Sequence, residues 1–295
     1  MEVVQKYIGL KAREKNITKR KLNIKGLFTH LSLIFFSIIM IFPFIWMIVS
    51  ALKTKEEMWQ FPPSLIPQVP QWQNFIEAFG SAPFGLYMFN STFTAIAIVA
   101  IQVVNSAMIA YALTQLEFKG KKYLFGIILG TYMLPGAATF VPSYIILSKL
   151  NLLNSYTGLI ISNAVNIFGI FLIRQAFLQV NKSLVEAAKI DGANHWQILW
   201  KILFPLTKPS FITFGLISFV TNYNNYLWPS LIIKNPELNL ISMGLRQFFI
   251  QEGAYGTEWP VVMAASTFTV LPLLILFLVA QKWFMNGFSD TGVKG

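Results

Sequence analysis

The sequence predicts an all-α integral membrane protein with six membrane-spanning helices and with both chain termini in the cytoplasm. Apolar residues make up 55% of the 295 residues and charged residues only 12%, whereas a soluble domain averages about 25% charged residues. Six long stretches carry no charged side chain, and basic residues gather between alternate stretches. A chain this apolar would expose large hydrophobic patches in water, so a lipid bilayer is its natural solvent.

Each of the six uncharged stretches is long enough to cross a bilayer, which takes about 20 mostly apolar residues at a rise of about 1.5 Å each. They are Gly26–Leu52, Ala78–Leu116, Tyr123–Ser148, Leu150–Ile173, Pro209–Ile233 and Trp259–Gln281. The second is longer than a span needs, and Ser81–Gly85 is typical of a turn, so its helix is expected to begin near Leu86. Burying six such helices in a soluble core would leave too little polar surface, which disfavours that alternative.

The distribution of Lys and Arg gives the expected orientation, because short cytoplasmic loops are enriched in these residues. Of the 23 Lys and Arg residues, 18 lie in one set of segments and 5 in the other. The first set comprises residues 1–25, 117–122, 174–208 and 282–295, and the second comprises residues 53–77, 149 and 234–258. The first set is therefore predicted to be cytoplasmic and the second external.

The basic N-terminal segment resembles the start of a signal peptide, but the apolar run after it is too long and no small-residue cleavage site follows. The chain is therefore expected to keep its first helix. It divides into a basic cytoplasmic N-terminal segment (1–25), a six-helix domain (26–285) that includes a large cytoplasmic loop (178–208), and a cytoplasmic C-terminal tail (286–295).

Several classes of function are disfavoured by composition. The chain has no cysteine and two histidines, so disulfides, thiolate metal sites and histidine-rich metal sites are not expected. A net charge of +11 would suggest nucleic acid for a soluble protein, but here the charge marks the cytoplasmic side. No pair of carboxylates lies in a span and no Ser–His–Asp grouping is visible, so no catalytic residue is expected, and His30 and His195 are interpreted as interfacial or surface residues.

Two external loops carry further information. Residues 59–72 contain four prolines and several aromatic residues, which predicts a stiff, non-helical segment. This segment is interpreted first as a linker packed on the membrane surface and second as part of a docking face for an external partner. The loop at residues 234–258 is long for a helix connection and mildly acidic, so it too is a candidate contact for an external partner.

The cytoplasmic loop at residues 174–208 is apolar at helical spacing, where an ordinary loop would be polar. Ser183 is a candidate helix cap with Glu186 three residues later, Gly192 suits a turn between two short helices, and Pro205 and Pro209 mark the return to the membrane. The candidates for one apolar face are Ala188, Trp196, Leu199 and Leu203. The pattern predicts a helix–turn–helix whose exposed apolar surface contacts a protein partner or lies in the lipid interface.

The same loop resembles the EAA loop of importers of the ATP-binding-cassette (ABC) superfamily. In that pattern, Glu-Ala-Ala is followed after three residues by Gly and after nine more by Ile-x-Leu-Pro. Here Glu186-Ala187-Ala188 precedes Gly192, and the second part reads Ile202-Leu203-Phe204-Pro205, with Phe204 replacing the Leu. Asp191 and Ala193 complete the Asp-Gly-Ala commonly found around the glycine.

The resemblance extends over nearly the whole chain to the maltose-type carbohydrate permeases, and in particular to the partner that ends in Val-Lys-Gly. The segments that carry it are Asn90-Ser91, Tyr111-Ala112-Leu113, Leu227-Trp228-Pro229 and the tail Gly292-Val293-Lys294-Gly295. The basic N-terminal segment does not belong to this pattern.

The resemblance implies a divided transport machine in a bacterial or archaeal cytoplasmic membrane. Two permeases would pair around a pathway, two copies of a cytoplasmic ATPase would bind ATP and Mg beneath them, and an external solute-binding protein would deliver a sugar. The chain has no Gly-x-x-x-x-Gly-Lys-[Ser/Thr] motif of its own, so it is expected to hold no cofactor. The expected ATPase-coupling residues are Glu186, Ala187, Ala188, Asp191, Gly192, Ile202 and Pro205, and the C-terminal tail is expected to reach the ATPase interface.

Polar residues inside a span usually face the bundle interior or a wet cavity, and they supply the candidates for a sugar pathway. In the fifth span, Asn222 and Asn225 are predicted to share a helix face, as are Tyr223 and Tyr226. Amides suit sugar hydroxyls and aromatic rings suit flat C–H faces, but helix–helix hydrogen bonds and an interfacial aromatic belt are the alternatives. Further candidates are Asn163, Asn166, Gln102 and Asn105.

The alternatives to a sugar permease follow from the same residues. A permease of this architecture for another solute, such as glycerol phosphate or an amino acid, remains open. A phosphate substrate would favour Arg or Lys inside the spans, and none is there. A membrane-embedded enzyme would show clustered ionisable residues at membrane depth, and a purely structural membrane protein would not need the EAA loop.

Overall fold

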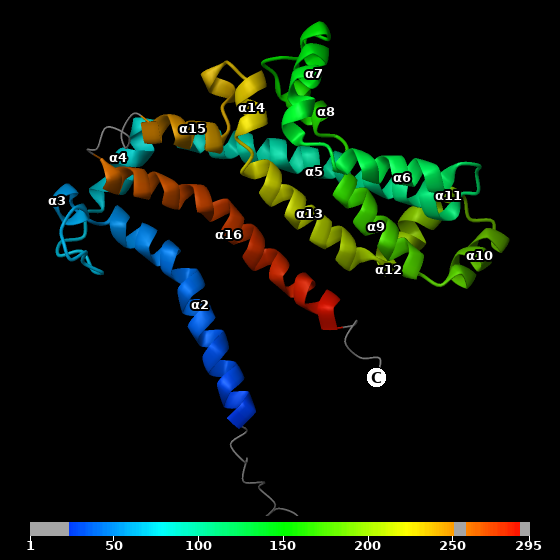
Figure 1. The fold of residues 1–295 in the computed structure, drawn as a ribbon, viewed down its shortest axis with the longest axis horizontal. Helices are drawn as coiled ribbons and strands as arrows, with labels where there is room; N and C mark the ends of the chain where they lie inside the picture. Colours follow the sequence, from blue (N-terminus) through cyan, green and yellow to red (C-terminus); the bar gives the residue numbers. More distant parts are fainter. Residues whose placement is uncertain (1–23, 251–257, 290–295) are drawn as a thin grey trace, which may run out of the picture. The chain divides into compact units, whose positions relative to one another are not determined.

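The computed structural model describes residues 24–250 and 258–289, and over these residues the regular secondary structure is helical, with no strand (Figure 1). The predicted all-α class is therefore confirmed for the part of the chain that is described. The basic N-terminal segment lies almost entirely outside the described residues, as does the final stretch of the C-terminal tail. The chain divides into two units, residues 1–48 and 49–295, and each is considered by itself.

The first unit contains most of helix α2 (Ile24–Ala51). This helix coincides with the first predicted span. Large apolar side chains from Leu27 to Phe44 are exposed around its whole circumference, and the rings of Phe42 and Trp46 stack with centroids 6.0 Å apart. A helix that is apolar on all sides suits a lipid environment.

The second unit holds all the remaining described helices. In chain order they are α3 (Lys55–Met58), α4 (Gln73–Ser81), α5 (Phe84–Gln115), α6 (Lys121–Tyr132), α7 (Gly136–Lys149), α8 (Tyr156–Ser162), α9 (Ile167–Gln179), α10 (Lys182–Ile190), α11 (His195–Gln197), the π-helix η1 (Ile198–Leu203), α12 (Phe204–Leu206), α13 (Lys208–Tyr223), α14 (Leu227–Ile232), the 3₁₀-helix η2 (Pro236–Leu238), α15 (Ile241–Phe248) and α16 (Trp259–Ser289).

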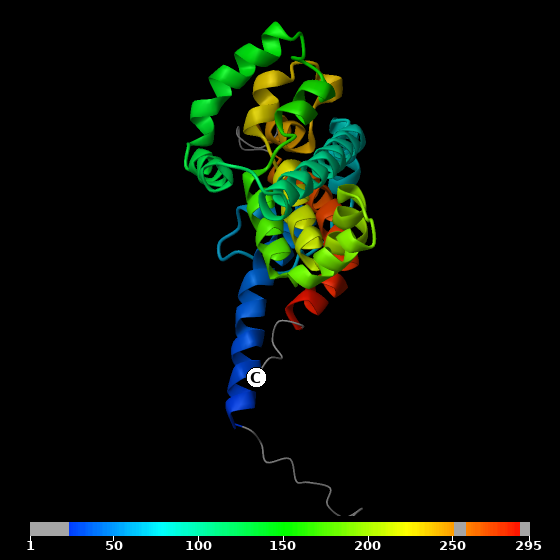
Figure 2. The same ribbon diagram turned by 90° about the vertical axis from the view of Figure 1, so that its right-hand side faces the viewer.

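Helix α5 is the centre of this unit. It packs against α9, α13, α8 and α15, and α13 in turn packs against α16, which also covers α4 (Figures 1 and 2). Ala107 and Ala110 on α5 are fully buried, so small residues allow the neighbouring backbones to approach closely. Such small-residue contacts are typical of helix packing in a bilayer.

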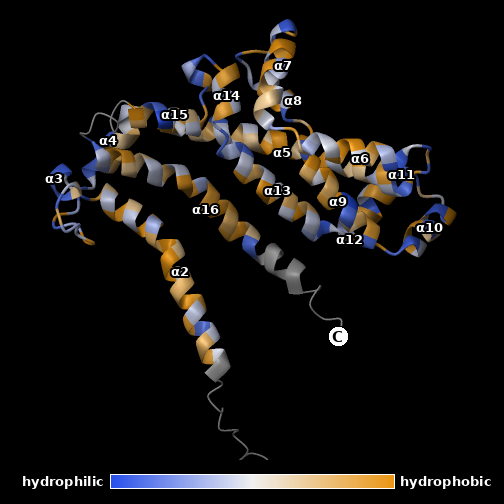
Figure 3. Ribbon diagram, viewed as in Figure 1, coloured by the Kyte–Doolittle hydropathy of each residue, from blue (hydrophilic) through white to orange (hydrophobic). Residues whose placement is uncertain are grey.

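Three helices are long and apolar enough to cross a membrane, namely α2, α5 and α16, and three bent pairs raise the number to six if each pair is one span. The bends are 99° between α6 and α7, 48° between α8 and α9, and 84° between residues 195–206 and α13. The third and fourth predicted spans coincide with the first two bent pairs, so neither is the single helix that was expected. Figure 3 colours the ribbon by hydropathy, and apolar residues recur along these helices.

The fifth predicted span, Pro209–Ile233, also differs from the structure. Helix α13 ends at Tyr223, residues 224–226 are not helical, and the short α14 follows. The second span is closer to expectation, because α5 begins at Phe84, two residues before the predicted start, after a turn that contains Pro83.

The proline-rich segment after α3 is non-helical, as predicted, and it folds around polar contacts. The Lys53 ammonium donates to the carbonyl of Ser64 at 2.6 Å, and the backbone N–H of Gln68 donates to the Glu57 carboxylate at 2.8 Å. The Asn74 amide donates to the carbonyls of Ala51 and Lys53. The polar groups of the segment are thus used internally, while its apolar residues Trp59, Phe61, Leu65, Ile66, Val69 and Trp72 are exposed.

Candidate coupling surface and solute pathway

The loop at residues 174–208 forms the predicted helix–turn–helix, but its first helix is capped differently. Asn181 is the N-cap of α10, and its side-chain oxygen accepts from the backbone N–H of Ser183 at 3.0 Å. The predicted cap at Ser183 is wrong, because Ser183 already lies inside the helix and an N-cap residue has extended backbone angles, as Asn181 does.

The turn after α10 depends on Gly192, as predicted. Its φ is +80°, in the left-handed region, and the backbone N–H groups of Gly192 and Ala193 donate to the carbonyls of Lys189 and Ala188. This closes the C-terminus of α10. The next helix starts with a capping box that the sequence analysis missed, in which Asn194 and Gln197 exchange side chain-to-backbone hydrogen bonds of 2.9 Å.

The second half of the loop joins the helix bundle through aromatic contacts. Phe204 packs against Trp200 and Phe211, with ring centroids 5.5 and 4.8 Å apart. The Phe that replaces the Leu of the EAA pattern is therefore part of the contact between the loop and α13. Helix η1 is a π-helix. Such helices are rare in proteins, and those that occur are often found at functional sites.

The apolar face of the loop is only partly the predicted one. Ala188, Leu199 and Leu203 are buried in a cluster with residues of α5, α9 and α13, so they hold the loop to the bundle. Trp196, which was expected on the same face, is 58% exposed, because it lies against only the edge of Trp200. Among residues 182–206 the exposed large apolar side chains are Leu184, Ile190, Trp196 and Leu206, and we call this set the coupling surface.

The EAA residues divide in the same way. Glu186, Ala187, Asp191, Gly192 and Pro205 are exposed, whereas Ala188 is buried and Ile202 is half-buried. The exposed members lie in the same short helices and turns as the coupling surface and are available to a partner, while the buried members belong to the packing of the loop.

One hydrogen bond ties the loop to α5. The Tyr111 hydroxyl lies 2.7 Å from Nδ1 of His195, the first residue of α11, and the two rings meet edge to face. His195 was predicted to be a surface residue, and it is exposed, but this contact was not foreseen. Close by, the Lys121 ammonium donates to the carbonyls of Thr114 and Leu116 and so closes the C-terminal end of α5.

The polar residues of the predicted pathway form a hydrogen-bond network at the break between α8 and α9. The Gln102 side chain donates to the carbonyl of Asn163 at 2.7 Å and accepts from the Ser218 hydroxyl at 2.6 Å. Asn222 donates to both the carbonyl and the hydroxyl of Ser218. Asn105 donates to the carbonyl of Ala164 at 2.9 Å. Broken helices inside a membrane need such partners for their free backbone groups.

The remaining pathway candidates have different surroundings. Asn166 caps α9 by accepting from the N–H of Gly169 at 3.0 Å. Tyr223 is 1% exposed and donates to the carbonyl of Thr269. The predicted shared faces of Asn222 with Asn225 and of Tyr223 with Tyr226 are wrong, because α13 ends at Tyr223, where the Asn222 and Asn224 side chains bond to carbonyls of their own helix.

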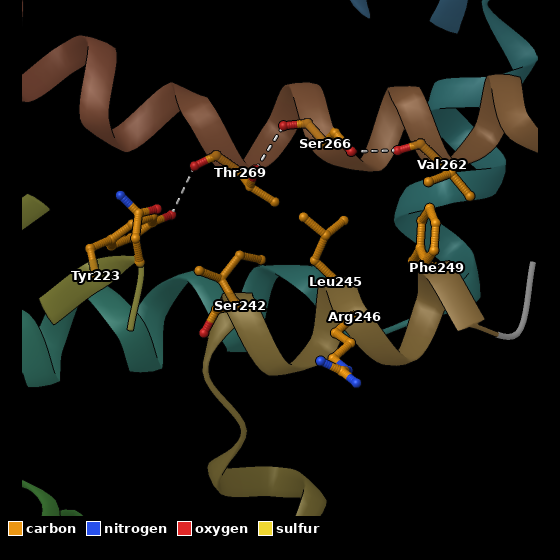
Figure 4. Close-up of a pocket in the computed structure, with 10 residues that line it drawn as sticks. Tyr223, Ser242, Leu245, Arg246, Phe249, Val262, Ser266 and Thr269 are labelled. Atoms are coloured by element: carbon orange, nitrogen blue, oxygen red, sulfur yellow. Dashed lines mark hydrogen bonds between the residues drawn. The ribbon is translucent and has the colours of Figure 1, made fainter. Parts of the chain in front are cut away.

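A pocket of about 360 Å³ lies beside the C-terminal end of α13 (Figure 4). It is lined by Tyr223, Asn224, Ile241, Ser242, Leu245, Arg246, Phe249, Val262, Ser266 and Thr269, which come from α13, α15 and α16 and the residues next to them. The Arg246 guanidinium also lies over the Tyr226 ring, 4.7 Å from its centroid. Arg246 was not a candidate in the sequence because it lies outside the predicted spans, although it is the only arginine between residues 234 and 258.

A family model described as "binding-protein-dependent transport system inner membrane component" matches residues 102–289. This chain belongs to that family. It is therefore a multi-pass inner-membrane subunit of an ABC importer, and a transport subunit that does not itself hydrolyse ATP. The resemblance recognised from the EAA loop is confirmed at the level of the family.

Relatives match this permease over most of their length. It is 35% identical over 277 residues to the sn-glycerol-3-phosphate transport system permease protein UgpE of Yersinia enterocolitica, covering 91% of this chain and 98% of the relative. It is 32% identical over 266 residues to the arabinooligosaccharides transport system permease protein AraQ of Halalkalibacterium halodurans, covering 88% and 94%. These two relatives are named for chemically different solutes, one anionic and one neutral.

The permease fold is also found among solved structures. A chain of a bacterial ABC transporter involved in the import of the acidic polysaccharide alginate matches with a TM-score of 0.78 and 24% identity, covering 92% of this permease and all of that chain. At this identity the match establishes the fold alone. This chain therefore has the fold of an ABC transporter permease.

Proposed function

We propose that this permease forms half of the translocation pathway of a sugar or oligosaccharide importer. It would pair with a second permease, most simply as a heterodimer, and two copies of a cytoplasmic ATPase would bind ATP and Mg beneath the pair. An external solute-binding protein would deliver the solute. The observation that carries the proposal is the helix–turn–helix, which holds Glu186, Ala187, Asp191 and Gly192 exposed around an apolar surface.

The proposed topology has six spans with both termini in the cytoplasm. Its support is the excess of Lys and Arg in alternate loops, together with the three long helices and the bent pairs α6–α7 and α8–α9. In this topology α13 and α14 share the fifth span. The α3–α4 region and the α14–α16 connection are external, and the helix–turn–helix is cytoplasmic, where an ATPase can reach it.

The proposed coupling step is a rigid-body contact. Glu186 would make a polar contact with the ATPase, Ala187 would permit close approach, and Asp191 and Gly192 would fix the angle between the two helices. Ala188 and Ile202 pack inside the loop, and Pro205 lies at its return to the bundle. A packed contact has discrete arrangements and does not stretch, so closure of the ATPase dimer would move α5, α9 and α13 as a unit.

The proposed solute is a sugar or oligosaccharide because a 32% identical relative is named for arabinooligosaccharide transport and the polar side chains near α13 suit hydroxyl groups. Asn222, Asn225, Tyr223, Tyr226, Asn163 and Asn166 remain the pathway candidates from the sequence. Several of these side chains already bond to the protein backbone, which supports a mainly structural role for them.

A glycerol phosphate is the second candidate solute. The 35% identical relative is named for sn-glycerol-3-phosphate transport, and Arg246 supplies a cation at the pocket wall. The sequence argument against an anion considered only the predicted spans, and α15 lies outside them.

The test begins with purification of the tagged chain from its own membranes in a mild detergent. We expect an ATPase, a second permease and a solute-binding protein to co-purify in fixed proportion. Substitution Ile190→Asp on the coupling surface, where Ile190 is 86% exposed, should remove the ATPase and retain the second permease. The matched control is Ile66→Asp, since Ile66 is 78% exposed but lies in the predicted external segment. Retention of the ATPase by the Ile190 variant would contradict the proposed coupling surface.

A further inference from the structure

The short helix α15 is fixed on one side and free on the other. Ile241, Met243 and Phe248 are buried against the bundle, and Gly244 is packed so closely on the Tyr87 ring that a Cβ atom there would collide with it. The opposite side of α15 carries Ser242 and Arg246, which are four residues apart and so share a face. The position of the Arg246 side chain is therefore set by a well-packed helix and not by a loose loop (Figure 4).

Arg246 lies between two pockets. The first, of about 360 Å³, is the one between α13, α15 and α16. The second, of about 300 Å³, is lined by Tyr226, Ser230, Ile233, Lys234, Pro236, Asn239, Met243, Arg246, Gln247 and Ile250. Arg246 lines both, so the two pockets are neighbours that share this residue. Each lies at the lower end of the range that is usual for a small-ligand site, about 300–1,000 Å³.

The charge around the two pockets is positive. Lys234 supplies a second cation in the second pocket, and no Asp or Glu is among the described residues that line either pocket. Within the described residues, Arg246 makes no ion pair. Its guanidinium group stacks on the Tyr226 ring, 4.7 Å from the ring centroid. Stacking on one face of a guanidinium leaves its N–H edge available for a carboxylate or phosphate.

We propose that the two pockets around Arg246 form an outer binding site for a carbohydrate-class solute that carries a negatively charged group, either a phosphate or a carboxylate. Arg246 would bind that group through paired N–H donors. In the second pocket, Lys234 would add a second positive charge and Asn239 and Gln247 would face solute hydroxyls, while Leu245 and Val262 would face C–H surface in the first pocket. The inference rests on the proposed import function and names the class of solute for it.

The electrostatic potential at the proposed site can be measured without knowing the solute. Because the chain has no cysteine, an introduced cysteine gives this subunit a single reactive thiol. We would introduce Ser242→Cys into the complete complex in nanodiscs and compare its reaction rates with two methanethiosulfonate reagents, one carrying a sulfonate and one a trimethylammonium group. The expected result is a faster reaction with the sulfonate reagent, relative to Ser81→Cys at the exposed end of α4. Adding Arg246→Gln should lower that preference several-fold.

A second cysteine position, Leu245→Cys, serves if the Ser242 variant does not assemble. An equal rate for both reagents, or a preference that Arg246→Gln leaves unchanged, would overturn the proposal. Failure of either thiol to react in an intact, ATP-hydrolysing complex would also overturn it, because the site would then be closed to solutes.

Uptake then identifies the solute class in proteoliposomes supplied with the binding protein. Matched pairs are sn-glycerol 3-phosphate with glycerol, and galacturonate with galactose, so the two pairs distinguish phosphate from carboxylate. We expect uptake of an anionic member, a loss of about tenfold or more in Arg246→Gln, and a smaller loss in Arg246→Lys. ATP hydrolysis stimulated by the binding protein, measured in the same vesicles, normalises each uptake rate to the amount of working complex.

These measurements separate the two proposals. Uptake of a neutral sugar that is insensitive to Arg246→Gln would refute the anionic site and leave the importer function intact. Absence of stimulated ATP hydrolysis in the unmodified complex would instead refute the importer function on which the site depends.

Discussion

The hydroxyl group of Tyr111, on the central helix α5, lies 2.7 Å from Nδ1 of His195, the first residue of α11 in the helix–turn–helix. This hydrogen bond joins the helix–turn–helix to the longest helix of the second unit by a polar contact, alongside the apolar cluster that contains Ala188 and Leu199. A hydrogen bond adds a directional constraint to the arrangement that the apolar packing already sets. The pair therefore fixes the orientation of the loop relative to α5.

Tyr111→Phe should loosen this connection while preserving the ring packing. Loss of one such hydrogen bond costs about 0.5–1.5 kcal/mol, so the complex should still assemble. We expect uptake per ATP hydrolysed to fall by about two- to fivefold in proteoliposomes, because the loop transmits its movement less faithfully. The control is Tyr123→Phe, since Tyr123 is exposed on α6. An unchanged ratio of uptake to hydrolysis would show that apolar packing alone transmits the movement.

Substitutions at Gly192 should show whether coupling requires its left-handed backbone conformation or its lack of a side chain at the partner contact. Its φ is +80°, and a Cβ atom there would meet nothing within 4 Å, so the penalty for a side chain is conformational. Gly192→Val should cost about 1–2 kcal/mol or more and uncouple hydrolysis from uptake. Gly192→Asn should retain most of the coupling, because Asn tolerates left-handed backbone angles. The measurement is the ratio of uptake to hydrolysis at equal expression.

The matched control for this series is Gly80→Ala in α4, where a Cβ atom also meets nothing within 4 Å and the backbone is helical. It should be neutral or slightly stabilising. If Val and Asn at position 192 behaved alike, the surface of the turn and not its backbone conformation would be the critical feature.

The sequence predicts the fold class and the coupling loop because both depend on local composition. Long uncharged runs predict helices, and Gly192 predicts a turn. The sequence did not predict that the spans are broken. The backbone at the break at residues 163–166 accepts hydrogen bonds from Gln102 and Asn105, which are distant in the chain. The backbone at the break at residues 224–226 accepts one from Ser242. No local pattern reveals that such partners exist.

Site residues divide in the same way. The EAA residues were found from their spacing, but which of them are exposed depends on the packing of η1 against the bundle. Arg246 was missed because the search for solute contacts was limited to uncharged spans. Only the folded chain brings α15 beside Tyr223 and Thr269. The available signal was a lone arginine in the loop at residues 234–258.

Gly169→Ala should disturb the contact between α9 and α13. A Cβ atom at position 169 would collide with the ring of Phe214, which is fully buried. Such overpacking typically costs about 1–3 kcal/mol, so the purified complex should lose its monodispersity at a lower temperature. Gly130→Ala on α6 is the control, because a Cβ atom there is in open space.

The double variant Gly169→Ala with Phe214→Leu should recover part of the lost stability, since the smaller side chain gives room for the new methyl group. Equal stability of the Gly169→Ala and Gly130→Ala variants would mean that α9 and α13 move apart at low cost and are not a rigid pair.

Gln102→Leu distinguishes a structural network from a solute contact. Gln102 is buried and joins the broken α8–α9 segment to α13 through Asn163 and Ser218. Its replacement leaves a buried carbonyl and a buried hydroxyl with fewer partners, at a cost of about 1–3 kcal/mol. We therefore expect a lower thermal stability, with an unchanged solute concentration for half-maximal uptake in the fraction that remains folded. Asn105→Leu, which removes a single hydrogen bond to Ala164, should have a smaller effect of the same kind. A raised half-maximal concentration with unchanged stability would instead place Gln102 in contact with the solute, and the network at the α8–α9 break would then belong to the translocation pathway.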